Sequence, residues 1–139
     1  MKHLFLLLFS LIICASYAQK IDIKEKITID NAHLITNFDK NNIESMVTYY
    51  FASRIRKDDK WKEVVPNPAE WSSRMKYSIK KHNGWKFLEF KNLGFYEDEY
   101  GSYVKVYIAI EFRGKKDGGE DEVELERKDG KWFITKVPI

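Results

Sequence analysis

The chain has 139 residues, with 24 Lys and Arg against 21 Asp and Glu, a formal net charge of +3 and a single cysteine. This length suits one domain, and the charge is far weaker than the cationic field that nucleic-acid binding requires. An internal disulfide is excluded, and no Gly-rich phosphate loop or spaced set of metal ligands occurs, so the sequence predicts no nucleic-acid partner, no cofactor and no metal site.

Residues 1–18 have the pattern of a secretory signal peptide. The segment from Leu4 to Ile13 is apolar apart from Ser10. This segment is too short for a permanent membrane span. Small residues follow at Ser16 and Ala18, where a signal peptidase cuts. We expect cleavage after Ala18, a mature chain that begins at Gln19, and export to the periplasm or the medium.

Cys14 lies inside this predicted leader, and two interpretations of it are open. A bacterial lipoprotein signal would lipidate it, but such a signal needs a small residue just before the cysteine, where this chain has Ile13. The favoured interpretation is that Cys14 is removed with the leader. The exported chain then has no thiol, no lipid anchor and no disulfide.

Residues 19–37 precede the main predicted domain, which spans 38–139. Isoleucines occupy the odd positions 21, 23, 27 and 29, with lysines between them. Alternation with β-branched residues is typical of a strand. The segment is therefore predicted to be either an added edge strand or a loose tail.

The first helix is predicted from Asp39 to Lys57, with Asp39 as the N-cap. Its apolar residues repeat at intervals of three and four and form one stripe: Ile43, Met46, Val47, Tyr50 and Phe51. Arg54 falls in the middle of this stripe. It either packs its stem near the helix end with its charged group in water, or it is a cation at the mouth of a pocket.

A second helix is predicted from Pro68 to Lys81, with Asn67 as its cap and proline at its first position. Trp71, Met75 and Ile79 form its inner stripe, and Gly84 is predicted to end it in a left-handed conformation. His82 lies on the extension of the stripe. It either packs at the helix end, favoured by the helix dipole, or binds a ligand or transfers a proton.

The rest of the chain is predicted to form strands. In "WKFLEFKNL", Trp85 and Phe87 are expected on one face and Leu88 and Phe90 on the other. Residues 102–112 alternate, with one apolar face made of Val104, Val106, Ile108, Ile110 and Phe112. In "EDEVELER", the glutamates share one face, while Val123 and Leu125 share the other. Asp129-Gly130 predicts a tight hairpin before the last strand. The fold class is therefore α+β: two N-terminal helices packed on a curved, four-stranded antiparallel sheet, with a possible extra N-terminal strand.

This order of elements, with the closing "VELERKDGKWFITKV", resembles the nuclear-transport-factor-2-like superfamily, and more closely its small exported bacterial domains. The resemblance covers about residues 38–138. It implies a cone, in which a bent sheet wraps around the helices and leaves a cavity at the open end. The superfamily includes ketosteroid isomerases and scytalone dehydratase, whose catalytic Asp, Tyr or His residues point into the cone. No equivalent set can be placed on the inward face predicted here, so the sequence assigns no catalytic residue.

Two classes of function follow. The favoured one is an exported, non-catalytic envelope domain that binds a small apolar ligand or a protein partner through its cone or its sheet face. The alternative is a small lyase, isomerase or hydrolase of the ketosteroid-isomerase type. The candidate site residues are Tyr50, Arg54, Trp71 and His82. Apolar residues expected on the outer sheet face also predict a homodimer.

Overall fold

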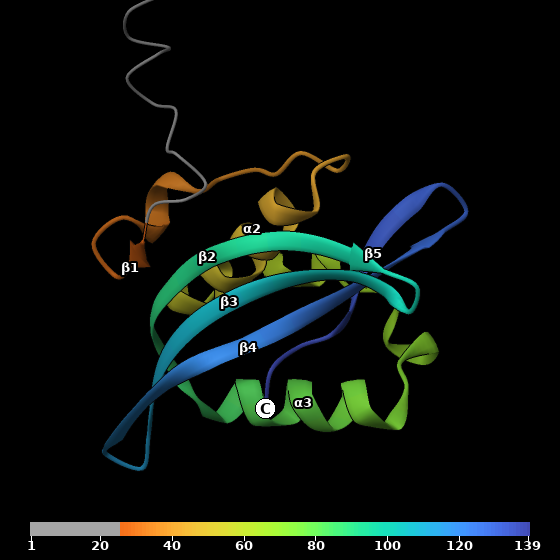
Figure 1. Ribbon diagram of the computed structural model, residues 1–139. Coiled ribbons are helices and arrows are strands. Elements are labelled where there is room, and N and C mark those ends of the chain that lie inside the picture. The colour runs from red at the N-terminus through yellow and green to blue at the C-terminus, as the bar shows by residue number, and fades with distance from the viewer. Residues whose placement is uncertain (1–25) are drawn as a thin grey trace, which may run out of the picture.

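The computed structural model describes residues 26–139, which form an α+β fold with an open antiparallel sheet in the order β1-β2-β3-β4-β5 (Figure 1). The strands are β1 (Ile27–Thr28), β2 (Lys86–Asp98), β3 (Gly101–Phe112), β4 (Lys115–Lys128) and β5 (Lys131–Lys136). The helices are α2 (Ile43–Arg56) and α3 (Ser73–Gly84), with the short 3-10 helices η1 (Ala32–Leu34), η2 (Lys60–Val64) and η3 (Pro68–Glu70). The predicted signal peptide, Cys14, Ile21 and Ile23 lie outside the described residues.

The predicted α+β class is confirmed, but the sheet has five strands because the N-terminal segment adds a short edge strand. Ile27 pairs with Phe90 and Thr28 with Glu89, and the Ile27 side chain is buried in the core. The strand ends there because the Asn31 side chain accepts a hydrogen bond from the Thr28 amide and donates one to the Lys26 carbonyl. Ile29, predicted to continue the strand, lies in a turn and is exposed.

Helix α2 lies against the sheet, behind β2 in the view of Figure 1, and is buried on all sides from Met46 to Ile55. All residues of the predicted apolar stripe are buried, but from Met46 onward the residues between them are buried as well, because β2, η1 and η2 surround the helix. The predicted N-cap is wrong. The Asn42 side chain accepts from the Ser45 amide, while the Asp39 carboxylate accepts from Asn41 in the preceding turn. At the other end, Lys57 adopts the left-handed conformation, with φ of 63°.

Helix α3 begins later than the sequence predicted. Asn67 does cap a helix, accepting from the Ala69 amide, but that helix is the single 3-10 turn η3. The backbone is extended at Trp71, and the Ser72 hydroxyl then accepts from the Met75 amide and starts α3. Met75 and Ile79 are buried as predicted. Gly84 is still helical and does not have a positive φ, so the predicted left-handed end is wrong.

Strand β2 is irregular, and its irregularities reverse part of the predicted facing. Its pairing with β3 shifts between Phe87 and Glu89, and again between Asn92 and Gly94. The first bulge places Leu88 outside the ladder, so that Phe87 and Phe90 face the same side and both are buried. The Phe90 ring stacks on Phe51 of α2, with centroids 4.8 Å apart. The prediction that Phe87 and Phe90 lie on opposite faces is therefore wrong.

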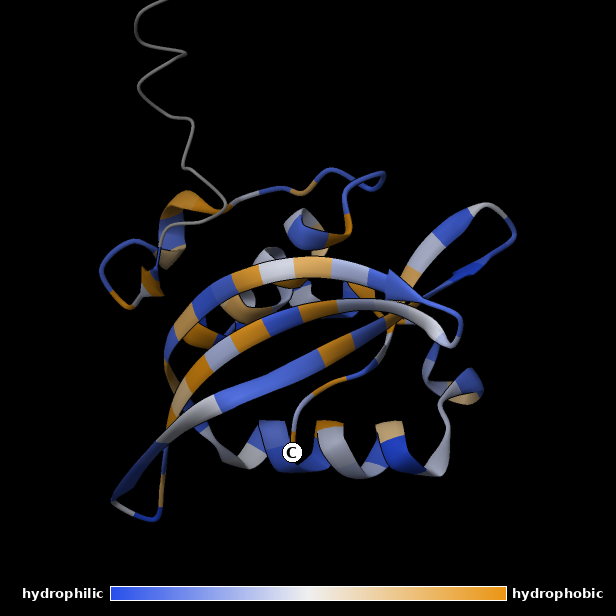
Figure 2. Ribbon diagram, in the orientation of Figure 1, coloured by the Kyte–Doolittle hydropathy of each residue, from blue (hydrophilic) through white to orange (hydrophobic). Residues whose placement is uncertain are grey.

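Strands β3 and β4 follow the predicted alternation. Val104, Val106 and Ile108 are buried, and they lie on the same face of the sheet as Val123 and Leu125 of the neighbouring strand β4. Figure 2 shows hydrophobic and hydrophilic residues alternating along β2 and β3, and a long hydrophilic run on β4. The Asp129-Gly130 turn is also confirmed, since both residues have a positive φ, as a tight hairpin turn requires.

Candidate functional site

A cavity of about 650 Å³ opens where the C-terminal ends of α2 and α3 meet the start of β2. Its lining is aromatic and charged: Arg54, Lys57, Asp58, Asp59, Trp61, Lys62, Trp71, Ile79, His82, Asn83, Gly84, Trp85, Lys86 and Phe87. Three of the four residues predicted from the sequence, Arg54, Trp71 and His82, line this cavity. The fourth, Tyr50, is fully buried behind them and contacts both Arg54 and His82.

Elements distant in the sequence bring these four residues together. Tyr50 and Arg54 are four residues apart on α2, so they lie on the same face of that helix. His82 lies in the last turn of α3, and Trp71 lies between η3 and α3. The predicted helical position of Trp71 is wrong. Its indole Nε1 donates to the Pro66 carbonyl at 2.7 Å, and this bond fixes the ring at the cavity.

Tyr50 and His82 form the buried part of the site. The Tyr50 hydroxyl lies 2.8 Å from His82 Nδ1, and His82 Nε2 lies 2.5 Å from the Pro138 carbonyl oxygen. A carbonyl only accepts, so Nε2 carries the proton and Nδ1 accepts from the tyrosine. The Tyr50 oxygen in turn accepts from Arg54 Nε at 3.2 Å. This chain uses both ring nitrogens of His82 and the hydroxyl proton of Tyr50.

The protonation states of this pair follow from its burial. Burial lowers the pKa of His82 to about 3, and the Arg54 charge acts in the same direction, against the hydrogen bond to Pro138. Burial also raises the pKa of Tyr50 to about 12, although the Arg54 charge and hydrogen bond oppose this shift. Both side chains are therefore neutral at pH 7, and they place no charge beside Arg54.

Arg54 is the cation at the floor of the cavity. It is only 8% exposed, and its guanidinium lies over the Trp61 ring, 3.8 Å from the ring centroid. Its Nη1 donates to Asn83 Oδ1 at 2.7 Å, while its Nη2 is buried without a hydrogen-bond partner. The two interpretations of Arg54 were a packed stem with a solvated head and a pocket cation. The guanidinium is buried and lines a cavity, so its head is not solvated, while a ligand-binding role for it stays a proposal.

Sequence reasoning missed three residues of this site, Trp61, Asn83 and Trp85. Trp61 lies in η2, which the sequence analysis left as an irregular break between helices. Its ring is buried between Arg54 and Trp71, 6.4 Å from the Trp71 ring. Asn83 could have been suspected, because it directly follows His82. No local pattern shows that η2 folds back onto α2.

The two carboxylates on the rim, Asp58 and Asp59, already have partners. Asp58 accepts from Arg56 Nε at 2.6 Å and from the Ser53 hydroxyl. Partial burial acts to raise the pKa of Asp58, but the hydrogen bonds from Arg56 and Ser53 together outweigh it and the pKa is lowered. Asp59 lies 3.5 Å from Lys62. Neither carboxylate forms an ion pair with Arg54.

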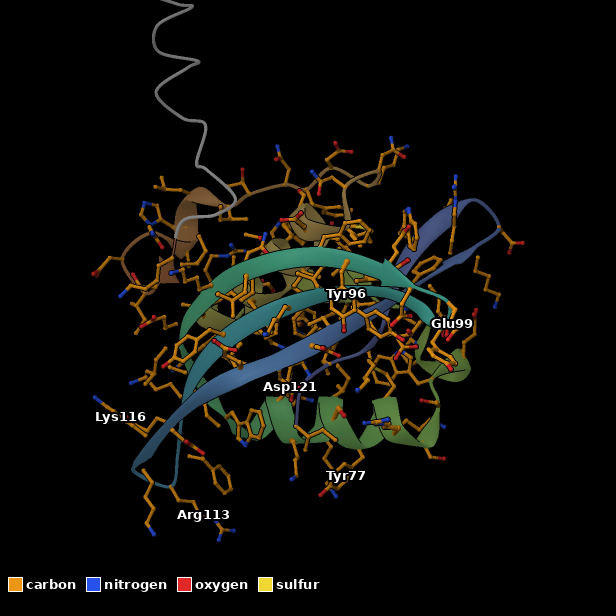
Figure 3. All side chains as sticks on the ribbon, viewed as in Figure 1. Tyr77, Tyr96, Glu99, Arg113, Lys116 and Asp121 are labelled. Carbon is orange, nitrogen blue, oxygen red and sulfur yellow. The ribbon has the colours of Figure 1, made fainter. Side chains whose placement is uncertain are left out.

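A second cavity of about 550 Å³ adjoins the first at Gly84 and Trp85. Its lining is more apolar and comes from α3 and the β3–β4 hairpin: Tyr77, Lys80, Lys81, Gly84, Trp85, Ile110, Phe112, Lys115 and Asp117. Figure 3 labels Tyr77 on α3 and Arg113 in the hairpin, the two elements that border this cavity. Tyr77 and Phe112 are both exposed.

Within residues 26–139, no group of three side chains suited to hold a metal ion occurs, and no helix has the length and apolarity to cross a membrane. Asp98 has a structural role, because its carboxylate accepts from the amides of Tyr100 and Gly101 in the β2–β3 turn. Comparison of the chain with protein-family models, curated proteins and solved structures finds no match.

Proposed function

We propose that the protein is an exported, non-catalytic domain that binds a small, largely apolar molecule in the cavity beside Arg54. One observation carries the proposal: the cavity is lined by Trp61, Trp71 and Trp85 around a single buried cation. A concave site that combines aromatic walls with polar groups able to orient a ligand is typical of small-molecule recognition. The rings supply apolar contact area, and Arg54 would orient the ligand.

The contacts of Tyr50 and His82 favour binding over the lyase, isomerase or hydrolase alternative. A general base needs a lone pair that can reach the substrate. Here the Nδ1 lone pair of His82 accepts from Tyr50, and its Nε2 proton is donated to Pro138. A histidine with a pKa of about 3 is also a weak base. Both residues are better explained as the rigid support of Arg54.

The resemblance to nuclear-transport-factor-2-like domains is part of this proposal, as is the cone shape that it implies. The order of two helices followed by an antiparallel meander supports it. Export is also proposed, and the intact mass of the protein recovered outside the cytoplasm tests it. An intact mass equal to that of residues 19–139 supports the predicted cleavage after Ala18. Retention of Cys14 with added acyl chains would contradict it.

Binding can be tested with N-phenylnaphthylamine, a neutral apolar fluorophore. We expect saturable binding to the mature protein and weaker binding to Trp85→Ala. Trp132→Ala is the matched control, because Trp132 is also a half-buried tryptophan but lies on β5, outside both cavities. Absence of saturable binding, or equal losses in the two variants, would contradict the proposed site.

A further inference from the structure

We propose that the ligand is a monocarboxylate with an apolar chain, and that its carboxylate binds the guanidinium of Arg54. This inference rests on the proposed function, since it names the chemical class that the same cavity would take. The carboxylate is the countercharge that Arg54 lacks. The apolar chain would extend along Trp85 toward the second cavity.

The first argument is the missing countercharge. Arg54 donates to Tyr50 and to Asn83, both of which are neutral, and its Nη2 donates to nothing. Among residues 26–139, no carboxylate lies within ion-pair distance of Arg54. Burying a charge is costly unless an opposite charge and hydrogen bonds compensate it. A buried guanidinium at a cavity, held only by neutral hydrogen-bond partners and the Trp61 ring, is therefore suited to receive an anion.

The second argument is that the nearby acids are not available to Arg54. Asp58 is held by Arg56 and Ser53, and Asp59 lies beside Lys62. The remaining cations on the cavity rim, Lys57 and Lys86, add positive charge. The rim therefore favours entry of an anion, and among the described residues that line the cavity Arg54 is the buried cation able to pair with it.

The third argument is the geometry of the guanidinium. A carboxylate matches two neighbouring guanidinium nitrogens in a forked pair. Nη1 is held by Asn83, which also lines the cavity, and Nη2 is free of partners but covered. We infer that the carboxylate replaces the Asn83 oxygen at Nη1 and takes up Nη2 in the same fork. Tyr50 would keep its bond to Nε and hold the guanidinium in place.

We place the apolar part of the ligand in the second cavity, which adjoins the first. The two cavities share Gly84 and Trp85, and the second is walled by Tyr77, Ile110 and Phe112. A chain that passes Trp85 would cover Tyr77 and Phe112, which are exposed in the described structure. This path favours a flexible chain over a compact molecule.

The test uses three amphiphiles with the same chain and different head groups: decanoate, decanol and decyltrimethylammonium, each kept below its micelle-forming concentration. Binding to the mature protein is followed by intrinsic fluorescence, because Trp61, Trp71 and Trp85 line the cavity. We expect decanoate to bind about tenfold or more tightly than decanol, as a hydrogen-bonded charge pair would produce. The ammonium compound should bind most weakly.

Arg54→Met should reduce the affinity for decanoate to that for decanol and leave decanol binding unchanged. Arg127→Met is the control, because Arg127 is exposed and outside both cavities. Equal affinities of wild type for decanoate and decanol, or an unchanged decanoate affinity in Arg54→Met, would overturn the inference and leave the proposed function standing. Failure of all three probes to bind would overturn both. If Arg54→Met does not fold, the order of affinities of the wild-type protein for the three amphiphiles still tests the inference.

Discussion

Acidification should destabilise the protein through His82, and the direction follows from its burial. In the unfolded chain His82 titrates near its ordinary pKa of 6.5, whereas burial lowers its folded pKa to about 3. Between these values the unfolded chain binds a proton that the folded protein does not bind. The contribution of neutral His82 is therefore fully present above about pH 6.5 and is lost as the pH falls toward 3.

The size of the effect follows from the same two values. At about pH 5 the solution is about 1.5 units below the unfolded pKa, and each unit is worth about 1.36 kcal/mol, which gives a loss of about 2 kcal/mol in the free energy of unfolding. At still lower pH the loss should approach about 4–5 kcal/mol. His82→Gln removes the titrating group, so that the variant should lose about 2 kcal/mol less than wild type on going to about pH 5.

Urea unfolding at neutral pH and near pH 5 measures this difference. The comparison concerns the response to pH, so a general loss of stability in His82→Gln does not affect it. His33→Gln is the control, because His33 lies on the surface of η1. It should keep the wild-type response. An identical pH response in wild type and His82→Gln would show that His82 is not buried in its neutral form, and it would refute the assigned hydrogen-bond chain.

Three further predictions test the fold. Phe90→Ala should lower the free energy of unfolding by about 3–5 kcal/mol, because the ring is fully buried against Phe51. Phe95 is exposed, so Phe95→Ala should lower the free energy of unfolding far less. Similar losses in the two variants would argue against the bulge. Ser72→Ala should cost about 1 kcal/mol as loss of an N-cap, and an unchanged urea midpoint would instead place the helix start at Pro68. The homodimer also stays a prediction, although inward-facing Phe90 reduces the apolar outer face on which it depended. Sedimentation of residues 19–139 at micromolar concentration tests it, and a monomer throughout would contradict it.

Local patterns in the sequence determined much of the fold. The alternation of Val104, Val106 and Ile108 defined both faces of β3, because a strand places successive side chains on opposite faces. The Asp129-Gly130 turn was predictable because few residues adopt a positive φ at low cost. The spacing of Tyr50 and Arg54 placed both on one helix face, and these residues do meet at the site.

The errors occurred where a local rule had several solutions. Asn67 and Ser72 are both good caps, and only the path of the chain past Trp71 decided that the long helix starts at the second. The bulge at Leu88 could have been suspected, because Phe87 and Phe90 are an odd number of residues apart. A regular strand cannot bury both rings on one face. The bulge adds one extra residue between them, so that both rings are buried in the core.

The site depended most on tertiary structure. Tyr50, Trp61, His82 and Pro138 come from four segments, and nothing in the local sequence indicates that they form one chain of contacts. Composition and periodicity predicted which residues are apolar enough to be buried. The tertiary structure alone decided that Arg54 is buried with them without an opposite charge, because the available carboxylates are bound to other groups.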